Sequence, residues 1–206
     1  MGRNSLKDIR QKEILKGFYQ VAKKEGLDNT SIAKVANHMG INPSLIIHYF
    51  KNKEEILLAF NDYILNRYKS LYKLPDGKVD SREKLEELID RLFSKKWNRL
   101  INDSVFYSCY ALTYRNKKQK HRFKDMHDKL RSLLRESLEE AKEAGVIRNT
   151  NMQELSEKIF FILEGAYYYL GMVEDNSEYN YKMNMIKNHV YSMLNFCPEK
   201  SAVTAK

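Results

Sequence analysis

Residues 30–53 concentrate side chains that can hydrogen-bond to phosphate oxygens and to the edges of bases. The stretch has the sequence TSIAKVANHMGINPSLIIHYFKNK. Hydroxyl, amide, imidazole and ammonium groups are donors to phosphates and bases, and apolar side chains can contact the methyl group of thymine. We therefore predict a nucleic-acid interface with these members: Thr30, Ser31, Lys34, Asn42, Pro43, Ser44, Leu45, Ile47, His48, Tyr49 and Lys53.

Five of these residues are predicted to hold phosphates: Thr30, Ser31, Lys34, Tyr49 and Lys53. Lys53 opens a predicted helix, so its ammonium group and the free amides of the first turn would form an anion site together. Contacts of this kind position a protein on a duplex, but they carry no sequence information.

Contacts that distinguish one base from another are predicted to come from a helix at residues 43–50. Ser44 and His48 can donate to bases or phosphates. At least one of Leu45 and Ile47 is expected to touch a thymine methyl group. The alternative for Leu45 is that it packs into the core formed with the neighbouring helices.

Two short helices joined by a tight turn would position these side chains. Thr30 or Ser31 can cap the first helix, because a hydroxyl accepts a hydrogen bond from the free amides of the first turn. Gly40 can adopt the left-handed conformation that ends this helix. Asn42 can cap the second helix, and Pro43 suits its first turn. This layout is a helix-turn-helix, whose second helix enters the major groove of DNA.

The same stretch resembles the DNA-binding signature of TetR-family repressors. The resemblance lies in the threonine at its start, the Val35–Ala36 pair, Gly40 with Ile41, the Tyr49–Phe50 pair and Lys53. The His-Tyr-Phe triplet preceded by two isoleucines also resembles the choline-responsive members. Many members carry a phosphate-contacting tyrosine in place of Ile47, so that contact is not expected here. The resemblance implies an all-α fold, with a three-helix DNA-binding domain followed by a helical bundle for ligand binding and dimerisation.

Composition and charge point in the same direction. The 206-residue chain has only 8 glycines and 3 prolines, and no run alternates strictly enough to demand a strand. The net charge is +9, and residues 1–53 contain ten Lys/Arg against four Asp/Glu. A basic first quarter is typical of a module that binds a polyanion. An ordinary solvated lysine surface is the alternative.

We predict a DNA-binding domain at residues 1–52, a ligand-binding and dimerisation domain at residues 53–197, and a disordered tail at residues 198–206. Helices after the first domain are expected at residues 53–72, 80–97, 103–114, 122–144, 152–172 and 179–196. The basic run from Arg115 to Arg122 is expected to be a solvated loop far from the DNA-binding domain. A second nucleic-acid patch is the alternative for this run.

The helix predicted at residues 152–172 is apolar on more than one side, so it must bury more than one face. Family resemblance implies that this helix and the one at residues 179–196 pair with their copies across a two-fold axis. Gly165 and Ala166 would allow the close approach of a partner helix. A homodimer would present two recognition helices to a palindromic operator. The alternative is that this helix is the central helix of a monomer.

Aromatic and sulfur-containing residues are frequent in the second domain, where the resemblance implies a pocket for a small-molecule inducer. The candidates for its lining are Phe93, Trp97, Tyr107, Tyr110, Tyr114, Phe123, Met126, His127, Phe161, Glu164 and Tyr168. Aromatic rings with one carboxylate, Glu164, would suit a hydrophobic cation. The alternative is that these aromatic residues only fill the core and the interface.

Other functional classes find little support. The chain lacks a glycine-rich phosphate loop, HExxH, CxxC and GxSxG, so we predict no catalytic residue, no cofactor and no metal site. No apolar run approaches the ~18 residues of a membrane span. The two distant cysteines, Cys109 and Cys197, suit a reducing cytoplasm. The prediction is a cytoplasmic dimeric repressor that a ligand releases from double-stranded DNA; the alternative is a constitutive regulator whose bundle binds a protein.

Overall fold

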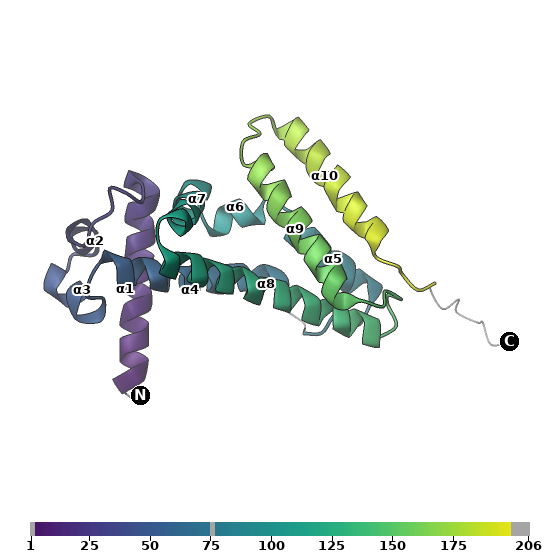
Figure 1. Cartoon of the computed structure of the whole chain (residues 1–206), viewed down its shortest axis with the longest axis horizontal. Helices are drawn as coiled ribbons and strands as arrows, with labels where there is room; N and C mark the ends of the chain where they lie inside the picture. The colour runs from purple at the N-terminus through teal and green to yellow at the C-terminus, as the bar shows by residue number, and fades with distance from the viewer. Residues whose placement is uncertain (1–2, 75–76, 199–206) are drawn as a thin grey trace. The chain divides into compact units, whose positions relative to one another are not determined.

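The computed structural model describes residues 3–74 and 77–198, and within these ranges the fold is all-α, as predicted (Figure 1). Beside the helices, the described residues form only two isolated β-bridges, Leu74 with Gly77 and Ile147 with Phe196. The helices are α1 (Arg3–Glu25), α2 (Ile32–Met39), α3 (Pro43–Tyr49), α4 (Lys53–Tyr72), α5 (Arg82–Leu92), α6 (Lys96–Leu100), α7 (Asp103–Ala111), the short 3-10 helix η1 (Leu112–Tyr114), α8 (Lys117–Glu143), α9 (Met152–Leu170) and α10 (Asn176–Met193).

The chain divides into two compact units. The first holds residues 1–68 and 96–129, and the second holds residues 69–95 and 130–206. The predicted functional boundary at residues 52 and 53 stays a prediction, and the predicted tail lies outside the described residues except for Pro198.

The first unit is built around α1, with α2 and α3 packed against it. Phe18 of α1, Ile46 of α3 and Phe60 of α4 are almost completely buried, and the rings of Phe18 and Phe60 meet edge to face at 5.4 Å. Further along the chain, the hydroxyl of Tyr19 accepts a hydrogen bond from the backbone amide of Asn102 at 3.0 Å. This bond ties α1 to the segment that leads into α7.

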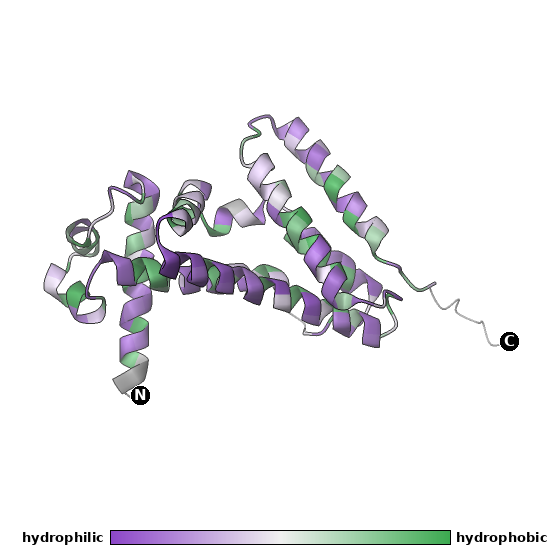
Figure 2. Ribbon diagram, viewed as in Figure 1, coloured by the Kyte–Doolittle hydropathy of each residue, from purple (hydrophilic) through white to green (hydrophobic). Residues whose placement is uncertain are grey.

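Three predicted helix boundaries are wrong. The last helix, expected at residues 179–196, is α10 at Asn176–Met193. The helix expected at residues 80–97 is two helices, because α5 ends at Leu92 and Trp97 lies in the separate helix α6. The basic run from Arg115 to Arg122 was expected to be a loop, but α8 begins at Lys117 and includes most of it. Figure 2 shows the start of α8 in purple, the hydrophilic end of its scale.

In the second unit, α9 and α10 lie side by side (Figure 1). The inner face of α9 buries Ile159 and Leu163 completely, while α10 contributes the buried Val190. No helix among the described residues is both long and apolar enough to cross a membrane.

Candidate nucleic-acid interface

The start of α2 is capped by Ser31 rather than Thr30, which settles the choice that the sequence left open. The hydroxyl of Ser31 accepts a hydrogen bond from the amide of Lys34 at 3.3 Å. Thr30 is 1 % exposed, and its hydroxyl donates to the carbonyl of Gly26 at 2.8 Å. Thr30 therefore stabilises the turn that follows α1, and its hydroxyl is bonded within the protein. Its role as a phosphate ligand stays a prediction. Ser31, in contrast, is exposed.

The turn between α2 and α3 has the predicted construction. Gly40 has φ of +65°, in the left-handed region that glycine adopts without strain. Its amide donates to the carbonyls of Ala36 and Asn37. The side chain of Asn42 accepts hydrogen bonds from the amide of Ser44 at 2.9 Å and from its hydroxyl at 2.8 Å. These contacts fix the angle at which α3 leaves the turn.

Helix α3 presents one exposed face and one buried face. Ile46 is completely buried, and Phe50, which follows the helix, is 4 % exposed. Pro43, Ser44, Ile47 and His48 are exposed. Because positions three and four residues apart share a helix face, these four side chains form a single outward surface. A helix that is anchored by its inner face can insert this surface into a groove.

The two apolar candidates on α3 have different environments. Ile47 is 50 % exposed, whereas Leu45 is half-buried. Because its branched aliphatic side chain is exposed on this surface, Ile47 is available to contact a thymine methyl group. The imidazole of His48 meets the ring of Tyr49 edge-on at 5.0 Å, and the backbone carbonyl of Tyr49 accepts a bond from Gln11 at 3.4 Å.

Lys34 and Lys53 are already engaged with protein groups. Lys34 forms an exposed salt bridge with Glu25 at 2.7 Å, and its hydrogen bond lowers the pKa of that carboxyl below the usual value. The ammonium of Lys53 donates to the carbonyls of Leu27 at 2.8 Å and Asp28 at 3.1 Å. Burial lowers the pKa of Lys53, and the charge of Asp28 partly offsets this effect. Lys53 therefore ties α4 to the turn before α2.

Sequence reasoning missed two residues beside this interface. Asn52 caps α4 by accepting a hydrogen bond from the amide of Glu55 at 3.0 Å. The carboxylate of Glu55 in turn accepts from the amide of Lys51 at 2.9 Å. Asn followed three residues later by Glu is a known helix-start signal that was available in the sequence. The side chain of Lys51 itself is exposed just after α3.

Seven of the predicted ligand-pocket residues lie in the first unit: Trp97, Tyr107, Tyr110, Tyr114, Phe123, Met126 and His127. Several of these seven residues form an aromatic cluster. Ring centroids lie 4.7 Å apart for Phe123 and His127 and 5.6 Å apart for Tyr110 and Phe123. Phe106, which was not among the candidates, joins the cluster at 5.4 Å from Phe123. Tyr110 and Tyr114 are exposed and share a hydrogen bond between their hydroxyls.

The other four candidates lie in the second unit and do not share one environment. Phe93 is buried at the end of α5, and Glu164 is half-buried on α9. Phe161 and Tyr168 are each 62 % exposed. Their exposure fits a surface contact better than the lining of an enclosed pocket. Among the described residues there is no group of three or more His, Cys, Asp or Glu side chains that could hold a metal ion.

Two family models match this chain. One, described as bacterial regulatory proteins of the tetR family, matches residues 14–60, which include α2, the turn and α3. The other, described as a tetracyclin repressor-like C-terminal domain, matches residues 80–196. Together they span both the candidate interface and most of the helices that follow it.

Curated relatives and solved structures agree with these matches. The chain is 26 % identical over 103 residues to the HTH-type transcriptional regulator BetI of Escherichia coli strain UMN026, covering 46 % of this chain and 50 % of the relative. It thus spans about half the length of the curated relatives it matches. A TetR regulator of Haloarcula marismortui has a TM-score of 0.77 at 20 % identity, with 91 % of this chain and 100 % of that chain covered. A candidate regulator of Saccharomonospora viridis in complex with choline has a TM-score of 0.68 at 16 % identity, with 91 % and 98 % covered.

Proposed function

The chain belongs to the tetR family of bacterial regulatory proteins, and we propose that it is a sequence-specific DNA-binding repressor. The observation that carries this proposal is the outward face of α3, held by the capped turn and anchored by the buried Ile46. Ser44 and His48 are the proposed hydrogen-bond donors to bases, and Ile47 is the proposed thymine contact. The proposed contacts to the DNA backbone surround this face; they are Ser31, Lys34, Asn42, Pro43, Tyr49 and Lys51.

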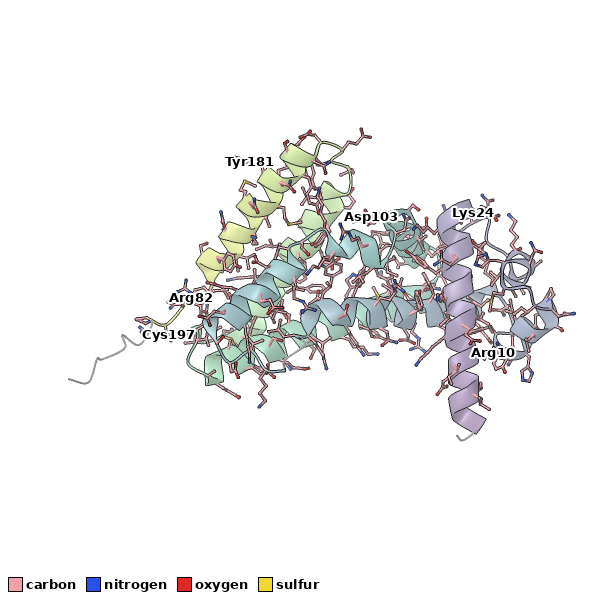
Figure 3. All side chains as sticks on the ribbon, turned by 180° about the vertical axis from the view of Figure 1, so that it is seen from behind. Arg10, Lys24, Arg82, Asp103, Tyr181 and Cys197 are labelled. Carbon is pink, nitrogen blue, oxygen red and sulfur yellow. The ribbon has the colours of Figure 1, made fainter. Side chains whose placement is uncertain are left out.

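The proposed assembly is a homodimer formed by α9 and α10. Four residues of α9 spaced by three or four positions form an exposed stripe: Phe161, Gly165, Tyr168 and Met172, the last just past the helix end. On α10, Tyr181 is 72 % exposed and Met185 55 % exposed, and Tyr181 is labelled in Figure 3. A Cβ added to Gly165 would meet no atom within 4 Å, so space remains there for a partner helix. Large exposed apolar surfaces of this kind are typical of interfaces.

The proposed effector is a small hydrophobic or cationic molecule bound among the helices after α4. Support comes from the aromatic cluster around Phe123 and His127 and from the choline complex of the Saccharomonospora viridis protein. Electron-rich ring faces attract ammonium groups that have lost their water. A ligand that binds the DNA-free conformation more tightly would shift the population away from the operator by its differential affinity.

DNA recognition is tested by selecting bound sequences from a random duplex library. The expected result is a palindromic consensus whose half-sites are separated by about one helical turn or a multiple of it. A variant with Ser44→Ala and His48→Ala is expected to lose discrimination among the selected sequences while keeping its unfolding temperature, because both side chains are exposed. Recovery of no consensus by the native protein would refute sequence-specific binding.

Ligand response is tested separately by titrating the operator complex with choline and with larger quaternary ammonium compounds. Release of DNA, accompanied by a rise in unfolding temperature, is expected for at least one of them. A constitutive regulator with a protein partner is the second candidate. It would be favoured if none of these compounds changed either the unfolding temperature or the affinity for DNA.

A further inference from the structure

The beginning of α8 carries a dense positive surface that the proposed function leaves unused. Between residues 115 and 124 there are six Lys/Arg and one His, with no acidic residue among them. We call these residues the α8 basic patch: Arg115, Lys117, Lys118, Lys120, His121, Arg122 and Lys124, all of which are exposed. The buried residues of the same turns are Gln119 and Phe123.

Few carboxylates neutralise the charge of this patch. On other helices, several cations pair with a carboxylate one turn away, as in Arg82–Glu86, Arg135–Glu139 and Lys182–Glu178. Within the patch, only Lys124 forms an ion pair with a described residue, Asp128. Unpaired like charges at this density repel one another, and the positive end of the helix dipole adds to that repulsion. A polyanion would relieve this repulsion by supplying the missing negative charges.

Two hydrogen bonds fix the patch beside the helix that follows α3. Asn116 donates to the carboxylate of Glu54, the second residue of α4, at 3.1 Å. Two turns further along α4, Asn61 donates to Gln119 at 2.9 Å, and both side chains are 3 % exposed. The patch, α3 and α4 as far as Tyr68 belong to the same compact unit. The positive surface is therefore held rigidly on the helix whose start lies next to the proposed recognition helix.

We propose that the α8 basic patch binds the phosphate backbone of the DNA that flanks each half-site, which rests on the proposed function as a DNA-binding regulator. A duplex continues beyond the base pairs that α3 contacts, and its phosphates present one negative charge about every 1.7 Å of helix axis. Lysine and arginine side chains on a helix can follow such a backbone without reading its sequence. The patch thereby adds affinity that depends on flank length and salt concentration but not on the operator sequence.

The test compares two variants with equal loss of charge. The patch variant carries Lys117→Gln, Lys118→Gln, Lys120→Gln and Arg122→Gln. The control carries Lys73→Gln, Lys78→Gln, Lys142→Gln and Arg148→Gln, which are exposed residues of the second unit. Binding to a fluorescent random-sequence duplex of about 40 base pairs is measured over a range of salt concentrations, because each lost phosphate contact reduces the salt slope by about 0.9.

The patch variant is expected to have a salt slope smaller by about 2 to 4 and an affinity lower by about tenfold or more, with little change in the control. On a selected operator that is trimmed to its palindrome, the patch variant and the control should have the same affinity and the same salt slope. Equal weakening in both variants, or wild-type binding by the patch variant, would overturn the proposal and assign the patch to another partner. Failure of the native protein to bind any duplex would instead refute the proposed function, and this inference with it.

Folding is controlled by requiring wild-type unfolding temperatures for both variants. If the fourfold patch variant is unstable, the pair Lys118→Gln and Arg122→Gln is used. It is expected to produce about half of the slope change, since the salt dependence scales with the number of contacts. An unchanged slope in this pair would count against the proposal in the same way.

Discussion

At the scale of single residues, two neighbouring side chains on α3 have different roles, one in the core and one on the surface. Ile46 is completely buried, whereas Ile47 is 50 % exposed. The chemistry of the two side chains is identical, so only their direction from the helix axis decides whether they stabilise the fold or contact a ligand.

Alanine substitution separates these two roles. Ile46→Ala is expected to lower the free energy of unfolding by about 2–5 kcal/mol, because it leaves a cavity in a packed core. Ile47→Ala should leave stability nearly unchanged and weaken operator binding by about 1 kcal/mol, or about fivefold. Chemical denaturation and DNA titration measure the two quantities. Wild-type operator affinity in Ile47→Ala would remove Ile47 from the interface.

Lys53→Met tests the contact between Lys53 and the carbonyls before α2. Because a hydrogen bond to a charged group contributes about 1.5–3 kcal/mol, we expect the free energy of unfolding to fall by about 1–2 kcal/mol. The matched variant Lys51→Met should keep its stability and reduce the salt slope of DNA binding by about 1. If Lys53→Met kept full stability and reduced the slope, Lys53 would be a phosphate ligand, as its position in the sequence first indicated.

The two cysteines should differ in reactivity. Burial raises the pKa of the Cys109 thiol to about 12, whereas Cys197 is only half-buried. Since the thiolate is the reactive form and its population falls about tenfold for each unit of pH below the pKa, one thiol per chain should react with a maleimide at pH 8. Mass spectrometry of intact protein counts the labels. Rapid labelling of both thiols in folded protein would show that Cys109 is accessible.

At the scale of elements, several helix ends depend on partners that are distant in sequence. The hydroxyl of Tyr167 on α9 accepts from the amide of Ser94 at 2.9 Å and lies 2.6 Å from the carbonyl of Leu92, to which it donates. These bonds satisfy backbone groups where α5 ends. The residues around this end, Phe93-Ser-Lys-Lys96, include neither glycine nor proline, so the break between α5 and α6 has no local signal.

Tyr167→Phe is therefore expected to lower the free energy of unfolding by about 1–3 kcal/mol, because it leaves buried backbone groups without their partner. Tyr169→Phe is the control, since Tyr169 is 48 % exposed, and it should change stability by less than about 0.5 kcal/mol. Equal stability of the two variants would contradict the role assigned to the Tyr167 hydroxyl.

At the scale of the whole molecule, assembly is expected to govern activity. A single recognition helix contacts few base pairs, and a two-fold dimer doubles the number of specific contacts. The proposed dimer surface on α9 and α10 and the proposed recognition surface on α3 belong to different compact units. Substitutions in one should therefore affect the other only through association.

Gly165→Arg tests this expectation. The added side chain meets no atom of its own chain near the Cβ, and arginine favours a helix more than glycine does, so the monomer should remain folded. We expect the variant to sediment as a monomer and to bind the operator at least about tenfold more weakly. Ala144→Arg, at another exposed position of the same unit, should remain a dimer. A dimeric Gly165→Arg variant would exclude the α9 stripe as the interface.

Local patterns in the sequence determined the helix-turn-helix and the all-α class. Gly40, Asn42 and Pro43 act through backbone conformation and hydrogen bonds within a few residues, so their effect can be predicted without knowing the rest of the fold.

Only the tertiary structure decided which partners the functional groups have. Lys53 has the sequence position of a phosphate ligand, but folding brings the carbonyls of Leu27 and Asp28 within hydrogen-bonding distance of its ammonium group. Similarly, Glu54 accepts a hydrogen bond from Asn116, just before α8, and Asn61 donates one to Gln119 of α8. The basic run was expected far from the DNA-binding domain, but it lies in the compact unit that contains α3. Such contacts join residues separated by 25 or more positions, and no local pattern encodes them, because they depend on how distant helices pack.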